Sequence, residues 1–300
     1  DLDDFYNIKN RIGEPGVGEA YYQTRFLGAF GDLTVGYKEY LFLHATGRND
    51  WTSLLSKGNN SFFYPGADVS FVFTEAFTGL KDFLDFGKIR GGIAQVGTLN
   101  IGPYQLQNLF GLAGGYPYGT LTSFVVDDTF KNPNLKPEMS ISKEIGLELG
   151  FLDSRVNLVL GAYQTNTKDQ TLTAQISYAS GFSGTNINTG ELMSKGFELE
   201  TRLIPVRMQN GLTVELNINY TLMETEVVSI TADQNEILIG GSTTGAGIWA
   251  IKGQPYPVLK ARGYKRDPEG RVIVDGKTGY PVSNPTPVSF GQTTPKHMVG

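Results

Sequence analysis

Two pairs of glutamates are the residues of this sequence whose type and spacing could do acid–base chemistry. Glu144 and Glu148 form one pair, and Glu198 and Glu200 form the other. Glycoside hydrolysis needs two carboxyl groups that flank the scissile bond, one as acid and one as nucleophile or base. Both pairs, however, sit at even positions of alternating polar and apolar runs, which places them on one face of a strand. We therefore favour a hydrated sheet face, which should also carry Arg202 and Glu215.

Other reactive residue types are sparse. The chain has no cysteine, and neither His44 nor His297 stands at a recognisable motif spacing from a serine and an acidic residue. Asp127, Asp128 and Asp169 could offer oxygen ligands to calcium, but their spacing is not that of an EF-hand loop. Zinc-protease, P-loop and nucleophile-elbow motifs are absent. The sequence thus predicts no catalytic residue, no metal site and no cofactor.

Aromatic residues in long, glycine-rich connections are the better candidates for binding. Sugars stack on aromatic rings and peptides dock on them, and these residues lie outside the expected strands. The alternative is that they pack the loops together or against a partner protein. The candidate ligand contacts are Tyr104, Phe110, Tyr116, Tyr118 and Trp249.

Composition narrows the class of protein. Among 300 residues there are 38 glycines, 18 phenylalanines and 15 tyrosines, while 40% of residues are hydrophobic. The net charge of −5 is spread along the chain without a basic block, which argues against nucleic acid as a partner. No run of about 18 apolar residues occurs, so the sequence predicts no transmembrane helix.

Long runs of period-two alternation dominate the chain. The clearest places Leu212, Leu216 and Leu222 on one face and Glu215 and Asn219 on the other. Several runs reach ten residues, longer than the five or six typical of soluble sandwiches and close to the 9–11 of a tilted bilayer-spanning strand. We count eight such strands, with a ninth expected to begin near Phe290. Charges on one face and aliphatic residues on the other predict a transmembrane β-barrel wall around a wet lumen, and hence six lumen-facing charges: Glu144, Glu148, Glu198, Glu200, Arg202 and Glu215.

The expected connections alternate between short and long, as in outer-membrane barrels with tight periplasmic turns and long extracellular loops. Short ones are expected at 38–39, 78–85, 152–154 and 205–211, and long ones at 50–66, 97–137, 173–191 and 226–289. On this orientation Tyr37, Phe77 and Phe151 belong to a lower aromatic girdle and Tyr220 to an upper one. Turn residues at 267–270 and 275–279 predict a small β-hairpin inside the last loop.

Several motifs, in order, resemble one family. They are Gly47-Arg48-Asn49-Asp50-Trp51, Ser61-Phe62-Phe63-Tyr64-Pro65, Asn132-Pro133-Asn134-Leu135-Lys136-Pro137-Glu138, Gly196-Phe197-Glu198 and Lys252-Gly253-Gln254-Pro255-Tyr256. This succession is similar to the SusC/RagA family of TonB-dependent outer-membrane transporters from Bacteroidota, over nearly the whole chain. The resemblance implies that residues 1–300 are about eight strands of a 22-stranded barrel, without the plug domain, the TonB box and the last strands.

The resemblance also implies a function without bond chemistry. Such barrels import nutrients, here glycans or oligopeptides, with a SusD-like surface lipoprotein that captures ligand. The TonB–ExbB–ExbD complex of the inner membrane supplies energy through the plug. The expected setting is therefore the lipid of the bacterial outer membrane, with the loops at the cell surface.

Two other classes remain open on sequence grounds. One is a TonB-dependent receptor for siderophores or cobalamin, and the other is a soluble surface β-sandwich that binds glycans. Eight strands alone would leave an open sheet with two free edges and a bare apolar face, which is unstable in water and in lipid. We therefore expect further polypeptide to complete the barrel.

Overall fold

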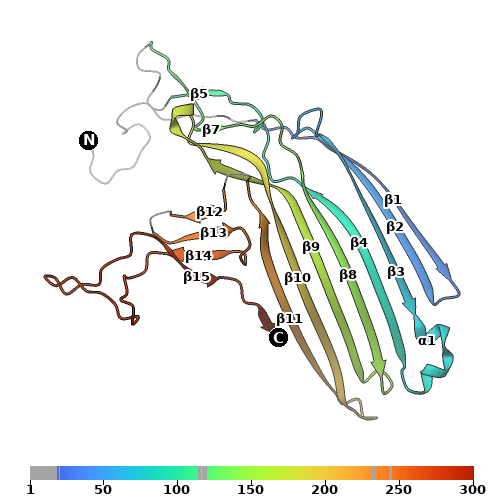
Figure 1. Ribbon diagram of the computed structural model, residues 1–300. Helices are drawn as coiled ribbons and strands as arrows, with labels where there is room; N and C mark the ends of the chain where they lie inside the picture. Colours follow the sequence, from blue (N-terminus) through green and yellow to red (C-terminus); the bar gives the residue numbers. More distant parts are fainter. Residues whose placement is uncertain (1–18, 20, 114–115, 117–119, 232–233, 243–244) are drawn as a thin grey trace, which may run out of the picture.

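One large antiparallel sheet forms most of the molecule (Figure 1). The computed structural model describes residues 19, 21–113, 116, 120–231, 234–242 and 245–300. Eight long strands follow one another in sheet order, so each is hydrogen-bonded to its neighbour in the list: β1 (Phe26–Tyr37), β2 (Leu41–Thr52), β3 (Ser61–Val72), β4 (Phe86–Thr98), β8 (Glu138–Phe151), β9 (Val156–Gln175), β10 (Gly184–Arg207) and β11 (Thr213–Ser229). The prediction of an all-β fold with eight long strands is confirmed.

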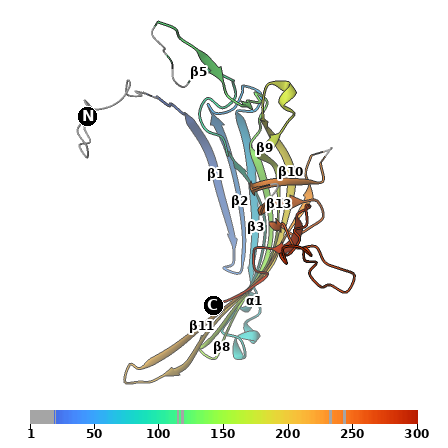
Figure 2. The ribbon, with the colours of Figure 1, turned by 90° about the vertical axis from the view of Figure 1, so that its left-hand side faces the viewer.

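The sheet is bent and twisted rather than flat, and the bend is clear when the molecule is turned by a quarter (Figure 2). Its two outermost strands are β1 and the short β16 (His297–Val299), which pairs with β11. These two strands do not pair with each other among the described residues, so the sheet is an open segment rather than a closed barrel. The ninth strand of this sheet therefore begins at His297 and not near Phe290.

Pairing register divides the sheet into two faces of opposite character. Ile145 stands opposite Ala162, which stands opposite Phe197, and Phe197 stands opposite Leu222. We call this side the apolar face; Leu33 on β1 is 63% exposed on it and Ile145 is 56% exposed. Exposure of this size across many aliphatic side chains is what a sheet shows when lipid, rather than a second layer of protein, covers it. The opposite side is the polar face.

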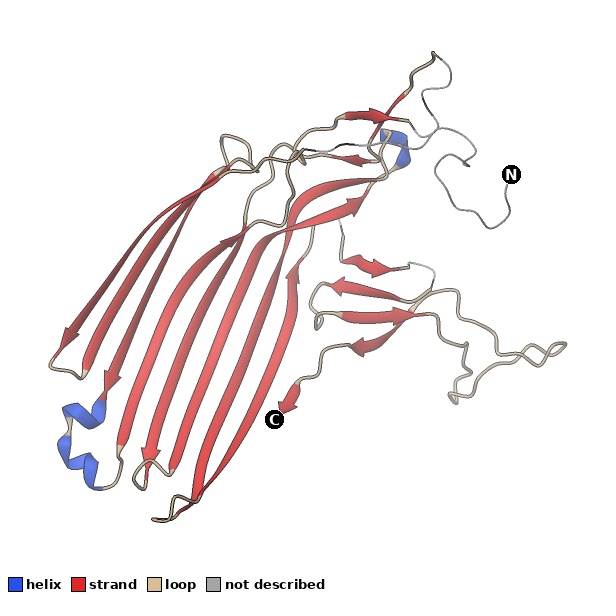
Figure 3. Cartoon of the chain, turned by 180° about the vertical axis from the view of Figure 1, so that it is seen from behind, coloured by secondary structure: helices blue, strands red, loops and turns tan. Residues whose placement is uncertain are grey.

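Tight turns join the strands at one end of the sheet. Lys38 and Glu39 both have positive φ, the conformation of a type I′ hairpin turn that matches the twist of antiparallel strands. The link from β3 to β4 instead contains α1 (Phe73–Ala76) and the 3-10 helix η2 (Thr78–Asp82), both visible at this end in Figure 3. The strand expected to reach Phe77 therefore stops at Val72.

A buried threonine explains why that strand ends early. Thr74 is fully buried, and its Oγ1 accepts a hydrogen bond from the Gly87 amide at 3.1 Å. A Cβ at Gly87 would lie 2.3 Å from the Phe73 ring, so only glycine lets α1 approach the start of β4. The alternating sequence pattern continues through this turn, but its backbone is helical, and the Thr74 side chain makes the hydrogen bond to β4.

At the opposite end the strands run further than expected. β9 and β10 continue to Gln175 and Gly184, and the link between them, 176–183, contains only the 3-10 helix η3 (Tyr178–Ser180). The link from β2 to β3 is likewise short, 53–60. The long loops expected at 173–191 and 50–66 are therefore mostly strand. The 99–137 connection is long as expected and contains the strands β5 (Phe110–Leu112), β6 (Phe124–Val126) and β7 (Thr129–Phe130).

A second, four-stranded sheet lies beside the β11 edge in Figures 1 and 3. It consists of β12 (Glu236–Gly241), β13 (Gly247–Ile251), β14 (Val258–Ala261) and β15 (Val288–Gln292). Its core joins Ile237 and Ala250 to Val227 and Ile230 at the end of β11, with Leu192 and Tyr256 packed against them. Phe290 belongs to this small sheet.

The predicted hairpin inside residues 264–283 is only partly correct. Both turns form, because Asp267 Oδ1 accepts from the Arg271 amide at 2.8 Å and Asp275 Oδ1 accepts from the Thr278 amide at 2.8 Å. Three short segments are then joined by single bridges, such as Arg266 to Val272 and Val274 to Pro281, rather than by a two-stranded ladder. No helix in the described part of the chain is long and apolar enough to cross a membrane.

Candidate functional site

The six charged residues predicted to share one sheet face do share the polar face. Register places Glu148 opposite Lys88, Glu198 opposite Thr221 and Arg202 opposite Asn217. The strands β8, β10 and β11 therefore present all six on one side: Glu144, Glu148, Glu198, Glu200, Arg202 and Glu215.

Cross-strand ion pairs neutralise part of this charge. Lys88 Nζ is 3.2 Å from Glu148 Oε1, and Arg90 Nε is 3.5 Å from the same oxygen. Arg202 Nη2 is 2.7 Å from Glu215 Oε2. Among the described residues, Glu198 and Glu200 enter no ion pair. The pairing pattern is that of a hydrated structural wall, because each contact joins neighbouring strands in register.

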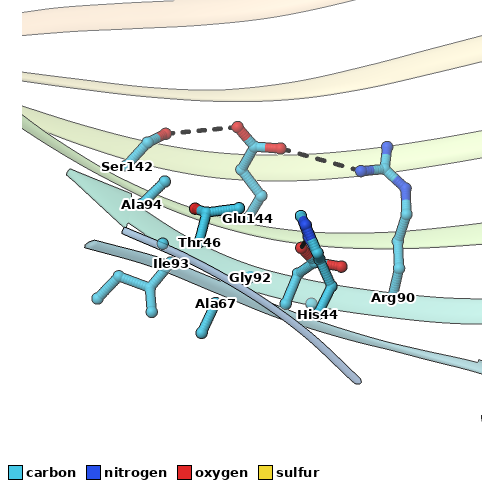
Figure 4. Close-up of a pocket in the computed structure, with 12 residues that line it drawn as sticks. His44, Thr46, Ala67, Arg90, Gly92, Ile93, Ala94, Ser142 and Glu144 are labelled. Atoms are coloured by element: carbon cyan, nitrogen blue, oxygen red, sulfur yellow. Dashed lines mark hydrogen bonds and ion pairs between the residues drawn. The ribbon is translucent and has the colours of Figure 1, made fainter. Parts of the chain in front are cut away.

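A histidine held by two aspartates lies on the same face. His44 on β2 is 2.8 Å from Asp32 through Nε2 and 2.6 Å from Asp68 through Nδ1. It borders a recess of about 430 Å³ that also contains Arg90, Glu144 and Ser142 (Figure 4). Arg90 is 3.9 Å from Glu144, and the Ser142 hydroxyl donates to Glu144 at 3.4 Å.

Sequence reasoning missed this group, treating His44 as a lone strand residue. The signal that could have found it is the Lys38–Glu39 turn, which sets Tyr37 opposite Leu41 and so Thr34 opposite His44. Asp32 then lies diagonally across from the histidine. In the described part of the chain, no group of three histidine or acidic side chains is arranged to hold a metal ion.

The four candidate aromatics that the structure describes do not form one cluster. Tyr104 lies against Tyr22 at a ring distance of 6.3 Å. Phe110, on β5, is 75% exposed, and Tyr116 in the same connection is also exposed. Tyr118 lies outside the described residues. Trp249 is far along the chain from these, on β13 of the small sheet.

Trp249 is the aromatic residue with a formed site around it. Lys260 Nζ lies 4.4 Å from the centre of its ring and is held there by Glu236, whose carboxylate oxygens are 2.8 and 2.9 Å away. Trp249 and Glu236 line a cavity of about 440 Å³ between the small sheet and the ends of β9 and β10, together with Tyr178 and Ser183. The Trp249 indole nitrogen is buried without a hydrogen-bond partner among the described residues. A ring and a carboxylate that line one cavity suit a polyhydroxylated or amide-bearing ligand.

The segment Asn132–Pro137 anchors the long connection that carries Tyr104, Phe110 and Tyr116. Leu135 is fully buried, and Asn59 Nδ2 donates to its carbonyl oxygen at 3.1 Å. Lys136 and Asn188 exchange two hydrogen bonds, of 2.7 and 2.8 Å. This motif therefore ties the 99–137 connection both to the β2–β3 turn and to β10.

A bent antiparallel sheet of long strands, with one charged face and one uncovered apolar face, is the wall of a membrane-spanning β-barrel. A family model described as TonB dependent receptor-like, beta-barrel matches residues 1–287. The chain belongs to this family of TonB-dependent outer-membrane receptors and transporters.

Known relatives agree with this assignment. The chain is 29% identical over 214 residues to TonB-dependent receptor P26 of Formosa agariphila, and the matched region covers 71% of this chain and 20% of that protein. It is 28% identical over 223 residues to TonB-dependent receptor SusC of Bacteroides thetaiotaomicron, and the matched region covers 70% of this chain and 22% of that protein. The solved RagAB peptide transporter shares the fold, with a TM-score of 0.76 at 19% identity over 92% of this chain and 31% of that chain. The chain thus spans about a fifth of the length of the curated relatives it matches.

Proposed function

We propose that this chain is part of the barrel wall and cell-surface loops of an outer-membrane importer that takes up glycans or oligopeptides. The observation that carries the proposal is the two-faced sheet, in which strands of 12 to 24 residues separate ion-paired charges from exposed aliphatic residues. Such a wall holds lipid on one side and a water-filled passage on the other. The six charges of the polar face then line that passage.

A SusD-like surface lipoprotein is the proposed partner on the outer side. The connection between β4 and β8 supports this, because its β5–β6 hairpin exposes Phe110, Leu121 and Phe124 beyond the ends of the long strands (Figure 1). Apolar side chains exposed together on a protruding hairpin are typical of surfaces that bind another protein. The RagAB structure, which shares this fold, is that of a peptide importer.

The cavity beside Trp249 is the proposed contact for the imported ligand. Its position near the loop ends of β9 and β10 supports this proposal, because these ends lie on the side from which a ligand would arrive. Energy would come from the TonB–ExbB–ExbD complex through a plug domain outside residues 1–300. Import is then a change in affinity between an outward-open state and a released state, driven by that complex.

The first test is the mass and composition of the complete protein extracted from outer membranes in mild detergent. We expect a mass several times the 32.8 kDa of residues 1–300, with a surface lipoprotein attached. A complete protein without a lipoprotein, whose cells take up siderophores or cobalamin instead of glycans or peptides, would contradict the proposed partner and cargo. A detergent-independent monomer would contradict the barrel itself.

The ligand contact has its own test. Trp249→Ala in the complete protein should reduce binding of the imported glycan or peptide by roughly tenfold, the effect of losing about 1.4 kcal/mol of contact energy. Trp51→Ala is a matched control, because Trp51 ends β2 on the apolar face, away from the cavity. Equal binding by both variants would remove Trp249 from the site.

A further inference from the structure

A row of lysines crosses the apolar face along one line of the pairing register. Register sets Lys143 of β8 opposite Gln164 of β9, Gln164 opposite Lys195 of β10, and Lys195 opposite Glu224 of β11. Lys296, just before β16, continues the row, since its carbonyl accepts from the Met223 amide at 2.9 Å. We call Lys143, Gln164, Lys195, Glu224 and Lys296 the basic row.

The basic row carries net positive charge. Glu224 is shared by two lysines, at 2.5 Å from Lys296 and 3.6 Å from Lys195. Lys143 is exposed and enters no ion pair among the described residues. Three lysines therefore face one carboxylate. The turns at the other end of the sheet mix signs instead, as in Lys38 beside Glu39 and Asp153 near Arg155.

On β8, β10 and β11 the row holds the first charged positions of the apolar face, counted from the tight turns. Two residues below it stand Ile145, Ala162, Phe197 and Leu222, and from there to the tight turns the outward positions of β8, β9 and β11 are uncharged. Lys143 and Phe151 are eight residues apart. This is about 26 Å along the strand, or roughly 20 Å along the membrane normal at a tilt of about 40°. Since the long connections lie beyond the row, it sits at the headgroup level of the outer leaflet.

A groove begins beside this row. Small residues of three strands, Ala45, Ala67 and Gly91, form its floor, and Leu33 with Val69 stand along its sides. The groove measures about 760 Å³, and Lys143 also lines it. By register, all of these positions belong to the apolar face. The groove is thus apolar, and Lys143, which enters no ion pair among the described residues, lies at its end nearest the lipid headgroups.

We propose that this surface binds an anionic lipid of the outer leaflet, with an acyl chain in the groove and headgroup phosphate on Lys143 and the basic row. The apolar band fixes the depth of the lysines, and phosphate is the anion that lipids present at this depth. Lysine ammonium groups bind phosphate as point charges, and their long stems reach up from an apolar surface. A bound lipid would fill the depression left by the small residues and seal the wall at that point.

The test compares lipid retention by variants of the complete protein. Lys143→Gln, Lys195→Gln and Lys296→Gln together should lower the affinity for a phosphorylated outer-leaflet glycolipid by roughly tenfold or more, as expected from the loss of several lysine–headgroup attractions. Replacement of the same three by arginine should keep it. A control with the loop lysines Lys252, Lys265 and Lys277 changed to glutamine should bind as the native protein does. Native mass spectrometry in mild detergent reads out the bound lipid.

A second variant tests the groove without altering charge. Ala45→Leu with Ala67→Leu should displace the lipid while the protein stays folded, as shown by its heat-modifiable band on electrophoresis. If the native protein shows no preference for phosphorylated over zwitterionic lipid, or if inorganic phosphate competes as well as the lipid, the proposal is wrong. These outcomes leave the proposed import function untouched, because ligand uptake is measured separately.

Discussion

His44 and Asp68 are joined across adjacent strands by a contact of 2.6 Å between the imidazole Nδ1 and a carboxylate oxygen. Asp32 holds the other ring nitrogen at 2.8 Å, so one imidazole links β1, β2 and β3 on the polar face. β1 is an outer strand of the sheet and has β2 as its neighbour. The imidazole therefore adds a side-chain link across three strands that backbone ladders already pair.

We expect His44→Ala to lower the thermal midpoint of the complete protein and to expose β1 to proteases. Without the imidazole, Asp32 and Asp68 lose their common hydrogen-bond donor and repel each other. Thr34→Ala is the control, since Thr34 stands directly opposite His44 but makes no side-chain hydrogen bond among the described residues. Identical melting and proteolysis of the two variants would show that the histidine carries no structural load.

The Lys88–Glu148 pair should show measurable coupling between β4 and β8. Both side chains are about one quarter exposed, at 27% each, and they stand directly opposite in register. A double-mutant cycle with Lys88→Gln and Glu148→Gln should give about 0.2–1 kcal/mol of coupling. Arg90 also contacts Glu148, so the single Glu148 variant should cost more than the single Lys88 variant. A coupling of zero would mean that water screens the pair completely.

Leu135→Ala should destabilise the loop anchor by about 2–5 kcal/mol, the usual cost of a cavity at a fully buried leucine. The same change at Leu121, which is 64% exposed in the same connection, should have little effect. Hydrogen exchange of residues 99–137 measures the difference. Equal exchange in both variants would contradict the anchoring role of the Asn132–Pro137 motif.

The turn at Asp267 should keep its order to unusually low pH. The Arg271 side chain, which donates to Asp267 at 2.7 Å, holds the pKa of that carboxyl below its ordinary value of 3.8. Because the pKa is lower in the folded state, the ionised Asp267 carboxyl stabilises the turn at all pH values above its ordinary pKa. This stabilisation is lost as the pH falls through the pKa of the folded state. Amide exchange of 267–271 should therefore stay slow at pH 4 and rise only below it.

Asp267→Asn should exchange faster already at neutral pH, because the ion pair is gone and its amide cannot reproduce both acceptors. Glu269→Gln removes only the outer contact to Arg271, at 3.0 Å, and should change exchange much less. A turn that loosens at pH 5 in the native protein would contradict the assigned role of Asp267.

Alternating hydrophobicity predicted the parts of the strands that lie between lipid and water. Leu212 to Leu222 is such a segment, and its faces are as expected. Above the apolar band both faces meet water, so the alternation disappears although the ladder continues. Thr173 of β9 and Asn186 of β10 are strand residues of this kind, although both fall in the loop expected at 173–191.

The types of residue in the candidate site were predictable from the sequence, but the groups that they form in space were not. The shared face of the charged residues follows from the strand period of two, which is local. The cavity at Trp249 depends on Lys260 and Glu236 meeting across a small sheet, for which the sequence carries no strong signal. The Asp32–His44–Asp68 group depends on the register of three strands. Both require the partner strand to be known.

The length of β10 has a consequence for how the protein meets its surroundings. Its 24 residues extend about 80 Å at 3.3 Å per residue, far more than the tilted crossing of a bilayer requires. The surplus is paired with β9 and β11 beyond the apolar band. This part of the wall therefore keeps its shape through strand pairing, without support from the membrane.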